Sequence, residues 1–274
     1  MPQVGRTTTP SVNSARPLRS ELGWSTRETI TSYGHDLPGE LIGHVSLGAM
    51  GFLGLTGRIP TPAEDRVFNA LLVTLVEHGQ TPSAIVARLT YLGAPEALQS
   101  AVAAGILGLG TVFVGTIEGS AKLVQEGLAG QPQDVDLDGL ADRIVEELAQ
   151  QKAIIPGVGH PLHKPLDPRT VRLFQVAKEE GVYGRHCALI ELVAAKAAVR
   201  YNRPLPLNAT GAIGAIASDL GLPWTITRGL GVMARAVGLV AHVLEEQQNP
   251  IAVEVWRRVD REVSDAHLPS SSGE

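Results

Sequence analysis

The residues best suited to chemistry gather in one loop near the middle of the chain. Residues 155–169 read IPGVGHPLHKPLDPR, and this run carries four side chains that could bind or transfer protons: His160, His163, Lys164 and Arg169. Proline lacks a donor N–H and glycine adds backbone entropy, so the run cannot be the interior of a helix. We expect a shaped loop that ends where Asp167-Pro168 begins a helix. The loop is either a binding or catalytic element or a solvated basic turn, and its residues alone leave both open.

A further histidine lies at the end of a predicted helix. Residues 61–64 read TPAE, a capping box with proline at the first helical position, and Gly79 ends the helix that follows. His78 therefore lies at a helix C-terminus, where the helix dipole favours an imidazolium. It either faces a ligand or caps the last carbonyls of the helix.

Three cationic or titratable side chains recur every seven residues on a predicted helix over about 227–246: Arg228, Arg235 and His242. This spacing places them on one face, two turns apart. On an otherwise apolar helix such a stripe costs desolvation free energy unless an anion faces it. The negative charge that faces these side chains could belong to a bound ligand or to neighbouring carboxylates, and the sequence favours neither.

Composition limits the class of protein. The chain has 274 residues, enough for one large domain or two small ones, and its net charge of -5 with dispersed positive residues argues against a nucleic-acid surface. The only cysteine, Cys187, lies in an apolar helical run and should be a core residue. We find no apolar run that predicts a membrane span and no secretory signal, so we expect a cytoplasmic protein that binds no membrane.

Common catalytic motifs do not account for the candidate residues. The chain lacks HExxH, and His160 and His163 are spaced three apart in a loop, so we expect no metal site. It also lacks the GxSxG of serine hydrolases, and the short Gly157-Val-Gly159 follows no predicted strand. The remaining interpretation is a cleft of histidines and arginines that acts on an anionic, carbonyl-containing substrate by acid–base and electrostatic catalysis.

The elements that position these residues are predicted to be helices. No stretch alternates with period two for long enough to predict a strand, so the fold should be all-α. Glycines spaced three and four apart over 43–54 predict a closely packed helix. Further helices are expected over 83–128, through Ile144 and Leu148, and over 167–180, 186–201, 209–221 and 227–246. Residues 1–20 and 261–274 should be flexible tails.

The loop at 155–169 resembles the signature loop of the citrate synthase superfamily, whose usual form is Gly-[Phe/Ile/Tyr]-Gly-His-Arg-Val-Tyr-Lys-x-x-Asp-Pro-Arg. Three more motifs occur in the family's order: Glu77-His78-Gly, Leu207-Asn208-Ala-Thr-Gly, and Arg235-Ala-Val-Gly-Leu-Val-Ala-His242 with Glu246 behind it. The resemblance covers about residues 21–248. It implies an all-α homodimer with a large and a small lobe, an active site between the lobes, coenzyme A thioester chemistry and no permanently bound cofactor.

The resemblance also implies boundaries and roles. The domain would span 21–260, with a large lobe over about 21–118 and 223–260 and a small lobe over about 119–222. His78 and His160 match histidines that hold and polarise the oxygen at the reacting carbon. Arg169 and Arg235 match arginines that grip substrate carboxylates, and Asn208 belongs to the same substrate site. The positions that match the strip contacting coenzyme A are Gly157, Val158, Gly159 and Lys164.

Three positions depart from the family's pattern. Glu118 stands where synthases have the histidine that stabilises the enol of acetyl-CoA; the lyase branch, including the C-terminal module of ATP citrate lyase, also lacks that histidine. Thr210 stands where the family has its catalytic aspartate. Asp36, Glu118 or His163 could replace that carboxylate, whereas Asp219 would lie about 13 Å further along a helix. Pro161 stands where the family has an arginine, which fits a substrate with fewer negative charges than citryl-CoA.

We therefore expect a citryl-CoA lyase-like enzyme that cleaves citryl-CoA, or a related 3-hydroxyacyl-CoA, to acetyl-CoA and a keto acid such as oxaloacetate. The same site run backwards would act as a citrate synthase. His78 or His160 would take the hydroxyl proton. The alternative is a catalytically weakened homologue that binds a CoA ester or a carboxylate in a regulatory or partner role, which Thr210 favours.

Overall fold

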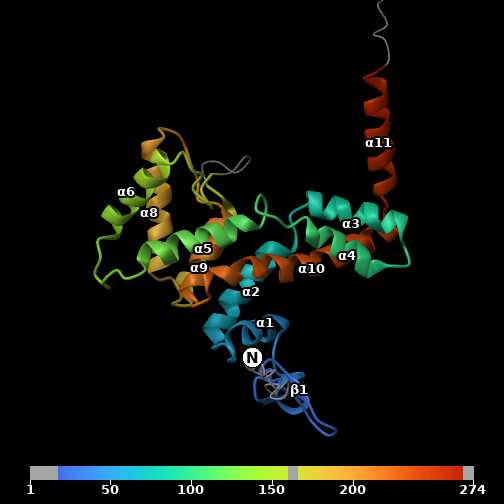
Figure 1. Ribbon diagram of the computed structural model, residues 1–274, viewed down its shortest axis with the longest axis horizontal. Helices are drawn as coiled ribbons and strands as arrows, with labels where there is room; N and C mark the ends of the chain where they lie inside the picture. The colour runs from blue at the N-terminus through green and yellow to red at the C-terminus, as the bar shows by residue number, and fades with distance from the viewer. Residues whose placement is uncertain (1–17, 160–165, 268–274) are drawn as a thin grey trace, which may run out of the picture. The chain divides into compact units, whose positions relative to one another are not determined.

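Helices make up nearly all of the regular structure in the computed structural model, which describes residues 18–159 and 166–267 (Figure 1). These residues form two compact units, one ending at Ile59 and the other beginning at Pro60. The all-α fold expected from the sequence is confirmed.

The first unit contains a small antiparallel sheet that the sequence analysis did not expect. Its strands are β1 (Trp24–Ser25), β2 (Ile30–Ser32) and β3 (His35–Asp36), in the order β1-β2-β3. Tyr33 and Gly34 both have positive φ, 47° and 82°, as a two-residue hairpin turn requires. Strands of two or three residues are too short to show alternation, which is why the pattern was not visible.

Two helical segments follow the sheet in the first unit. A short π-helical turn, η1 (Leu37–Leu41), follows β3, and helix α1 (Leu47–Thr56) begins at the N-cap Ser46, whose side chain accepts a hydrogen bond from the Ala49 amide. Gly57 ends α1 with a φ of 74°. The glycine-rich helix predicted over 43–54 therefore begins at Leu47 and includes the buried Phe52 and Leu53.

The second unit consists of ten further helices in the described residues: α2 (Pro62–Val76), α3 (Pro82–Gly93), α4 (Leu98–Leu107), α5 (Gly115–Leu128), α6 (Leu137–Gln150), α7 (Pro168–Glu179), α8 (Arg185–Arg200), α9 (Ala209–Asp219), α10 (Trp224–Gln248) and α11 (Ala252–Asp265). The capping box at the start of α2 is confirmed, since the Thr61 side chain and the Glu64 side chain each accept a hydrogen bond from the other's amide. The helical region predicted over 83–128 is divided into three helices.

Helix α10 is the centre of this unit. It packs against α2, α3, α4 and α5, while α5, α8 and α9 pack together beside it and α6 packs on α8 (Figure 1). A methyl group on Gly214 of α9 would come within 2.6 Å of the Ile117 carbonyl oxygen of α5, so only glycine permits this approach. By length and composition alone α10 could cross a membrane, but half of its most apolar stretch is buried in the protein, as in a core helix.

Helix α7 contacts both α2 and α9. It therefore connects a helix packed on α10 with the set formed by α5, α8 and α9. The last helix, α11, contacts α3 and extends away from the other helices of this unit (Figure 1). The sequence analysis placed a flexible tail from residue 261, whereas α11 continues to Asp265. An i,i+4 ion pair between Arg258 and Glu262, 2.7 Å apart, supports its last turns.

Candidate functional site

Most of the predicted site residues lie at one cavity of about 500 Å³ in the second unit, although Gly157 and Val158 do not line it. Its walls come from α2, the start of α3, the α4–α5 connection, α5, α7, the start of α9, and α10. Six residues chosen from the sequence line it: His78, Gly159, Arg169, Asn208, Thr210 and Arg235. His160 and Lys164 lie outside the described residues.

Arg169 is held at this cavity by the N-cap of its own helix. The Asp167 carboxylate accepts hydrogen bonds from Arg169 Nε and Nη2 at 3.1 and 2.8 Å, and from the Ala209 amide at 3.1 Å. Burial by itself would raise the pKa of Asp167, but these hydrogen bonds and the guanidinium charge outweigh burial and hold the pKa below its usual range. One carboxylate therefore fixes both the guanidinium and the start of α9.

Arg169 and His78 meet across the cavity. Arg169 Nη1 lies 3.4 Å from His78 Nδ1. A guanidinium can only donate, so this contact favours the neutral imidazole with its proton on Nε2. The histidine at the end of α2 thus has a cation beside it rather than the open helix terminus that the sequence suggested.

Arg235 has no hydrogen-bonded counter-ion in the described structure. It is 8% exposed, and among residues 18–159 and 166–267 its Nη1 atom is buried without a hydrogen-bond partner. Burial lowers the pKa of this guanidinium, and the charge of Glu77 offsets part of that effect. A buried cation that lines a cavity without a paired carboxylate is suited to bind an anion, because an anion there would offset the cost of burying the charge.

The other members of the α10 stripe do have carboxylates. Arg228 Nε lies 2.6 Å from Glu118, and His242 Nε2 lies 2.9 Å from Glu77. The two explanations left open by the sequence therefore apply to different residues. Neighbouring carboxylates face Arg228 and His242, whereas Arg235 faces the cavity.

Thr210 belongs to a short chain of polar groups. Thr116 donates to the Thr210 hydroxyl at 3.0 Å, and Thr210 donates to Asn208 Oδ1 at 2.7 Å. Asn208 in turn donates to the Gly159 carbonyl at 2.8 Å, which ties the loop to the start of α9. The sequence analysis did not select Thr116, because a lone threonine beside a glycine gives no signal of such a partner.

No carboxylate lines this cavity among the residues that the structure describes. Glu118 is bound to Arg228, and Asp36 belongs to the first unit. Asp219 caps α8, where it accepts hydrogen bonds from the amides of Gly184, His186 and Cys187. His163 lies outside the described residues. Of the replacements considered from the sequence, none is placed at the site by the described structure.

The strip predicted to contact coenzyme A is packed directly on α9. Gly157 has a φ of 82°, and a methyl group there would come within 2.4 Å of Gly211 Cα. The amides of Val158 and Gly159 donate to the carbonyls of Ile155 and Pro206. Gly157 therefore serves close backbone packing, whereas Gly159 is required by its φ of 97° rather than by lack of space. Contact of this strip with a thioester stays a prediction.

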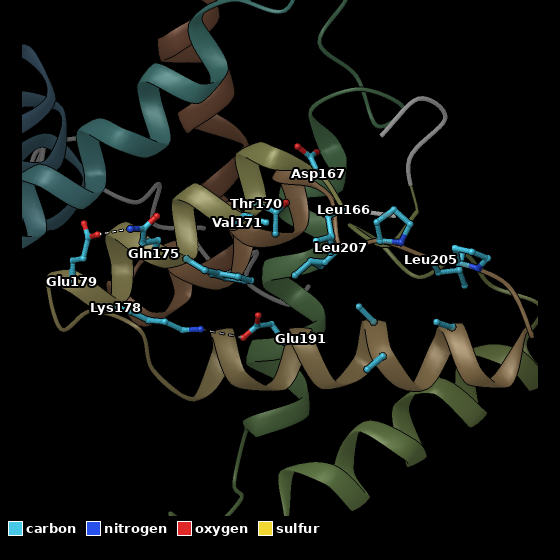
Figure 2. A pocket seen from close by; sticks show the side chains of 16 residues that line it. Leu166, Asp167, Thr170, Val171, Gln175, Lys178, Glu179, Glu191, Leu205 and Leu207 are labelled. Atoms are coloured by element: carbon cyan, nitrogen blue, oxygen red, sulfur yellow. Dashed lines mark hydrogen bonds and ion pairs between the residues drawn. The ribbon is translucent and has the colours of Figure 1, made fainter. Parts of the chain in front are cut away.

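A larger cavity of about 900 Å³ lies between α7 and α8 (Figure 2). Its walls are mainly apolar, with Val171, Leu205 and Leu207 among them, and its lysine is used internally, since Lys178 lies 3.9 Å from Glu191. It offers neither a histidine nor an unpaired cation among the described residues. The smaller cavity is therefore the candidate active site.

A metal site finds no support in the described part of the chain. No group of three or more His, Cys, Asp or Glu side chains there could hold a metal ion.

Comparison with known proteins places this geometry in a family. The family model "Citrate synthase, C-terminal domain" matches residues 44–257. The chain belongs to the citrate synthase family. Within that family it resembles the solved citryl-CoA lyase of Hydrogenobacter thermophilus, with a TM-score of 0.78 and 35% identity over 85% of this chain and 88% of that one.

Two further proteins define how far the likeness reaches. ATP citrate lyase of Methanothrix soehngenii, solved with citrate and coenzyme A, has a TM-score of 0.70 and 20% identity over 90% of this chain and 43% of that one, which shows the shared fold alone. The citrate synthase of Heyndrickxia coagulans is 28% identical over 71% of this chain and 51% of its own length. The chain spans about half the length, or less, of the curated relatives it matches.

Proposed function

We propose that this protein is a citryl-CoA lyase-like enzyme that cleaves citryl-CoA, or a related 3-hydroxyacyl-CoA, to acetyl-CoA and a keto acid such as oxaloacetate. The observation that carries the proposal is the buried Arg235 guanidinium, whose Nη1 has no hydrogen-bond partner among the described residues, in the same cavity as Arg169 and His78. Two guanidinium groups beside an imidazole suit a substrate that combines carboxylates with a reacting oxygen. Family membership and the likeness to citryl-CoA lyase support the same reaction.

In this proposal the arginines hold the substrate and His78 acts on its oxygen. Arg235 and Arg169 bind the carboxylates of the keto-acid portion. His78, with its proton on Nε2, donates to the oxygen at the reacting carbon and polarises it. Of the two predicted bases, His160 is then left to take the hydroxyl proton, because the proton-bearing Nε2 cannot accept one.

The bond changes balance without a redox cofactor. Loss of the hydroxyl proton forms the carbonyl of the keto acid as the carbon–carbon bond breaks. The electron pair of that bond passes to the acetyl thioester as an enolate, which takes up one proton to give acetyl-CoA. Run backwards, the same steps give the synthase reaction, so we propose no preferred direction.

The step with no matching side chain among the described residues of the cavity is the proton transfer at the enolate carbon. Thr210 stands at the family's carboxylate position, and a hydroxyl is not a general base near neutral pH. Loss of a positioned acid–base group typically costs about 100- to 10,000-fold in rate. We therefore expect turnover below that of a member with the carboxylate, unless another group supplies the proton.

We also propose that the chain acts as a homodimer or a larger homo-oligomer in the cytoplasm. Large apolar side chains remain exposed on the last two helices: Val237, Val240, Leu244, Trp256, Val259 and Val263. A second copy of the chain would bury such faces. Light scattering after size exclusion measures the state directly, and a monomer at micromolar concentration would contradict this part of the proposal.

The proposed activity is tested by following oxaloacetate release from citryl-CoA, coupled to malate dehydrogenase, in the native protein, Thr210→Asp and Thr210→Asn. We expect turnover by the native protein and a faster rate for Thr210→Asp than for Thr210→Asn, whereas similar rates for the two variants would show that another residue supplies the proton. A silent native protein with an active Thr210→Asp variant would identify the weakened homologue instead.

If neither the native protein nor Thr210→Asp releases oxaloacetate, thermal stabilisation by ligands distinguishes the remaining explanations. If coenzyme A and oxaloacetate raise the melting temperature without turnover, the chain is a binding member of the family. If neither ligand does so, and acyl-CoA esters with fewer carboxylates are not cleaved, the proposed function is wrong. A preference for those esters over citryl-CoA would support the substrate suggested by Pro161.

A further inference from the structure

A buried polar network lies behind the candidate active site, between α3 and α10. Arg88 is 1% exposed and donates to Glu246 Oε2 at 2.9 Å. Its Nη2 and Nε atoms also lie 3.1 and 3.3 Å from His242 Nδ1. Neither Arg88 nor His242 lines the candidate site, so the proposed reaction leaves this network unexplained.

The network determines which nitrogen of His242 carries the proton. Because a guanidinium only donates, Nδ1 of His242 must accept. The proton of the neutral ring is then on Nε2, which lies 2.9 Å from Glu77 Oε2. His242 therefore accepts from Arg88 at Nδ1, while its Nε2 lies at ion-pair distance from Glu77 without the alignment of a hydrogen bond.

Glu77 carries the network to the active-site histidine. Its other oxygen, Oε1, accepts from the backbone amides of His78 at 2.9 Å and Gly79 at 2.5 Å. These bonds hold the bend of the chain directly after α2. The same bend is braced by α10, since a methyl group on Gly238 would come within 1.9 Å of the Val76 carbonyl oxygen.

We propose that His242 is a positioning residue for His78 and acts through Glu77. The Glu77 side chain is 51% exposed, so without the buried imidazole it would be free to turn into water and release the His78 and Gly79 amides. The imidazole of His78 would then lose its fixed position beside Arg169. This inference rests on the proposed function only where turnover is the readout.

Two variants of His242 separate positioning from simple stability. In His242→Gln the amide oxygen can accept from Arg88 and the amide nitrogen can donate to Glu77, whereas His242→Leu fills similar space without either group. We expect His242→Leu to lower kcat for citryl-CoA about tenfold, the lower end of the range for residues that orient a functional side chain, with little change in KM. His242→Gln should recover most of that loss.

A matched control is His186→Leu, which removes another partly buried histidine paired with a carboxylate, Asp219, 2.8 Å away at a separate surface hollow. It should lower the melting temperature and leave kcat and KM unchanged. Equal kcat values for His242→Leu and the native protein would overturn the proposal, as would a kcat loss in His242→Gln as large as that in His242→Leu.

A second readout needs no substrate. In protein labelled with ¹⁵N-histidine, the His78 imidazole signals, assigned through His78→Asn, should shift or broaden in His242→Leu and stay in place in His242→Gln. Unchanged His78 signals in a folded His242→Leu protein would overturn the proposal. If the native protein does not turn over citryl-CoA, the proposed function fails while this measurement still decides the role of His242.

Discussion

Arg169 Nη1 and His78 Nδ1 lie 3.4 Å apart, although 91 positions separate the two residues in the chain. The guanidinium is held by Asp167, which accepts hydrogen bonds from two of its nitrogens and also from the Ala209 amide at the start of α9. The N-cap of α7 therefore orients a cation of the candidate active site and, beside it, the helix that carries Thr210. Variants of this aspartate should affect ligand binding as well as stability.

Asp167→Asn should weaken binding of oxaloacetate about tenfold, because a neutral amide cannot hold the guanidinium as a carboxylate does. Calorimetry with the purified protein measures the affinity. The matched control is Asp219→Asn, which alters another buried carboxylate that caps a helix, away from the candidate site. The control should lose stability and keep its affinity. Equal affinity in Asp167→Asn and the native protein would show that Arg169 is not a ligand.

Arg235→Met should weaken oxaloacetate binding without lowering stability, the opposite of the Asp219→Asn control. The native guanidinium is buried with Nη1 unpaired in the described structure, so its removal should leave the free energy of unfolding unchanged or raise it. Hydrogen bonds from a charged donor contribute about 1.5–3 kcal/mol, so the Kd for oxaloacetate should rise about 10- to 100-fold. Urea unfolding and calorimetry test both parts, and a large loss of stability would contradict the assignment of Arg235 to an anion site.

Asp219 should contribute stability that depends on pH. Burial alone would raise its pKa, but hydrogen bonds from His186, Cys187 and Gly184 outweigh burial and lower the pKa below its usual range. At pH values between the lowered pKa of the folded protein and the ordinary pKa of the unfolded chain, the unfolded chain binds more protons than the folded one. The free energy of unfolding therefore rises with pH over this range. The contribution is fully present above pH about 4, the ordinary value for aspartate, and is lost as the pH falls further.

Asp219→Asn should therefore cost about 1–3 kcal/mol at pH 7. Urea unfolding of the two proteins at pH 7, 5, 4 and 3 should show this difference unchanged down to about pH 4 and smaller at lower pH. A difference that grows on acidification would have the wrong sign for a carboxylate stabilised in the folded state.

Cys187 should be inert in the folded protein. It is fully buried on α8, and burial, together with the nearby charge of Asp219, raises the pKa of its thiol. Dithionitrobenzoate should react with it only after guanidinium unfolding. Because the chain has one cysteine, the colour yield reports on this position alone. Rapid labelling of the native protein would show that α8 opens.

Local signals in the sequence predicted most of the helical architecture. The capping box at Thr61 predicted the start of α2, and Asp167-Pro168 predicted the start of α7, because caps depend on neighbours within one turn. The breaks between α3, α4 and α5 were not predicted, although Pro95 lies in the first break and Gly108 and Gly110 lie in the second. The strands at Trp24 and Ile30 were missed because strands so short show no alternation.

By itself the sequence determined the all-α fold, the family and the set of charged residues that reach the candidate site, because motifs and caps are written in contiguous residues. Only the tertiary structure decided how the charges pair. Arg88 and His242 are 154 positions apart, and Arg228 meets Glu118 from another helix. Spacing along one helix shows that Arg228, Arg235 and His242 share a face. It cannot show which of them meets a carboxylate, because the partners come from helices that only packing brings near.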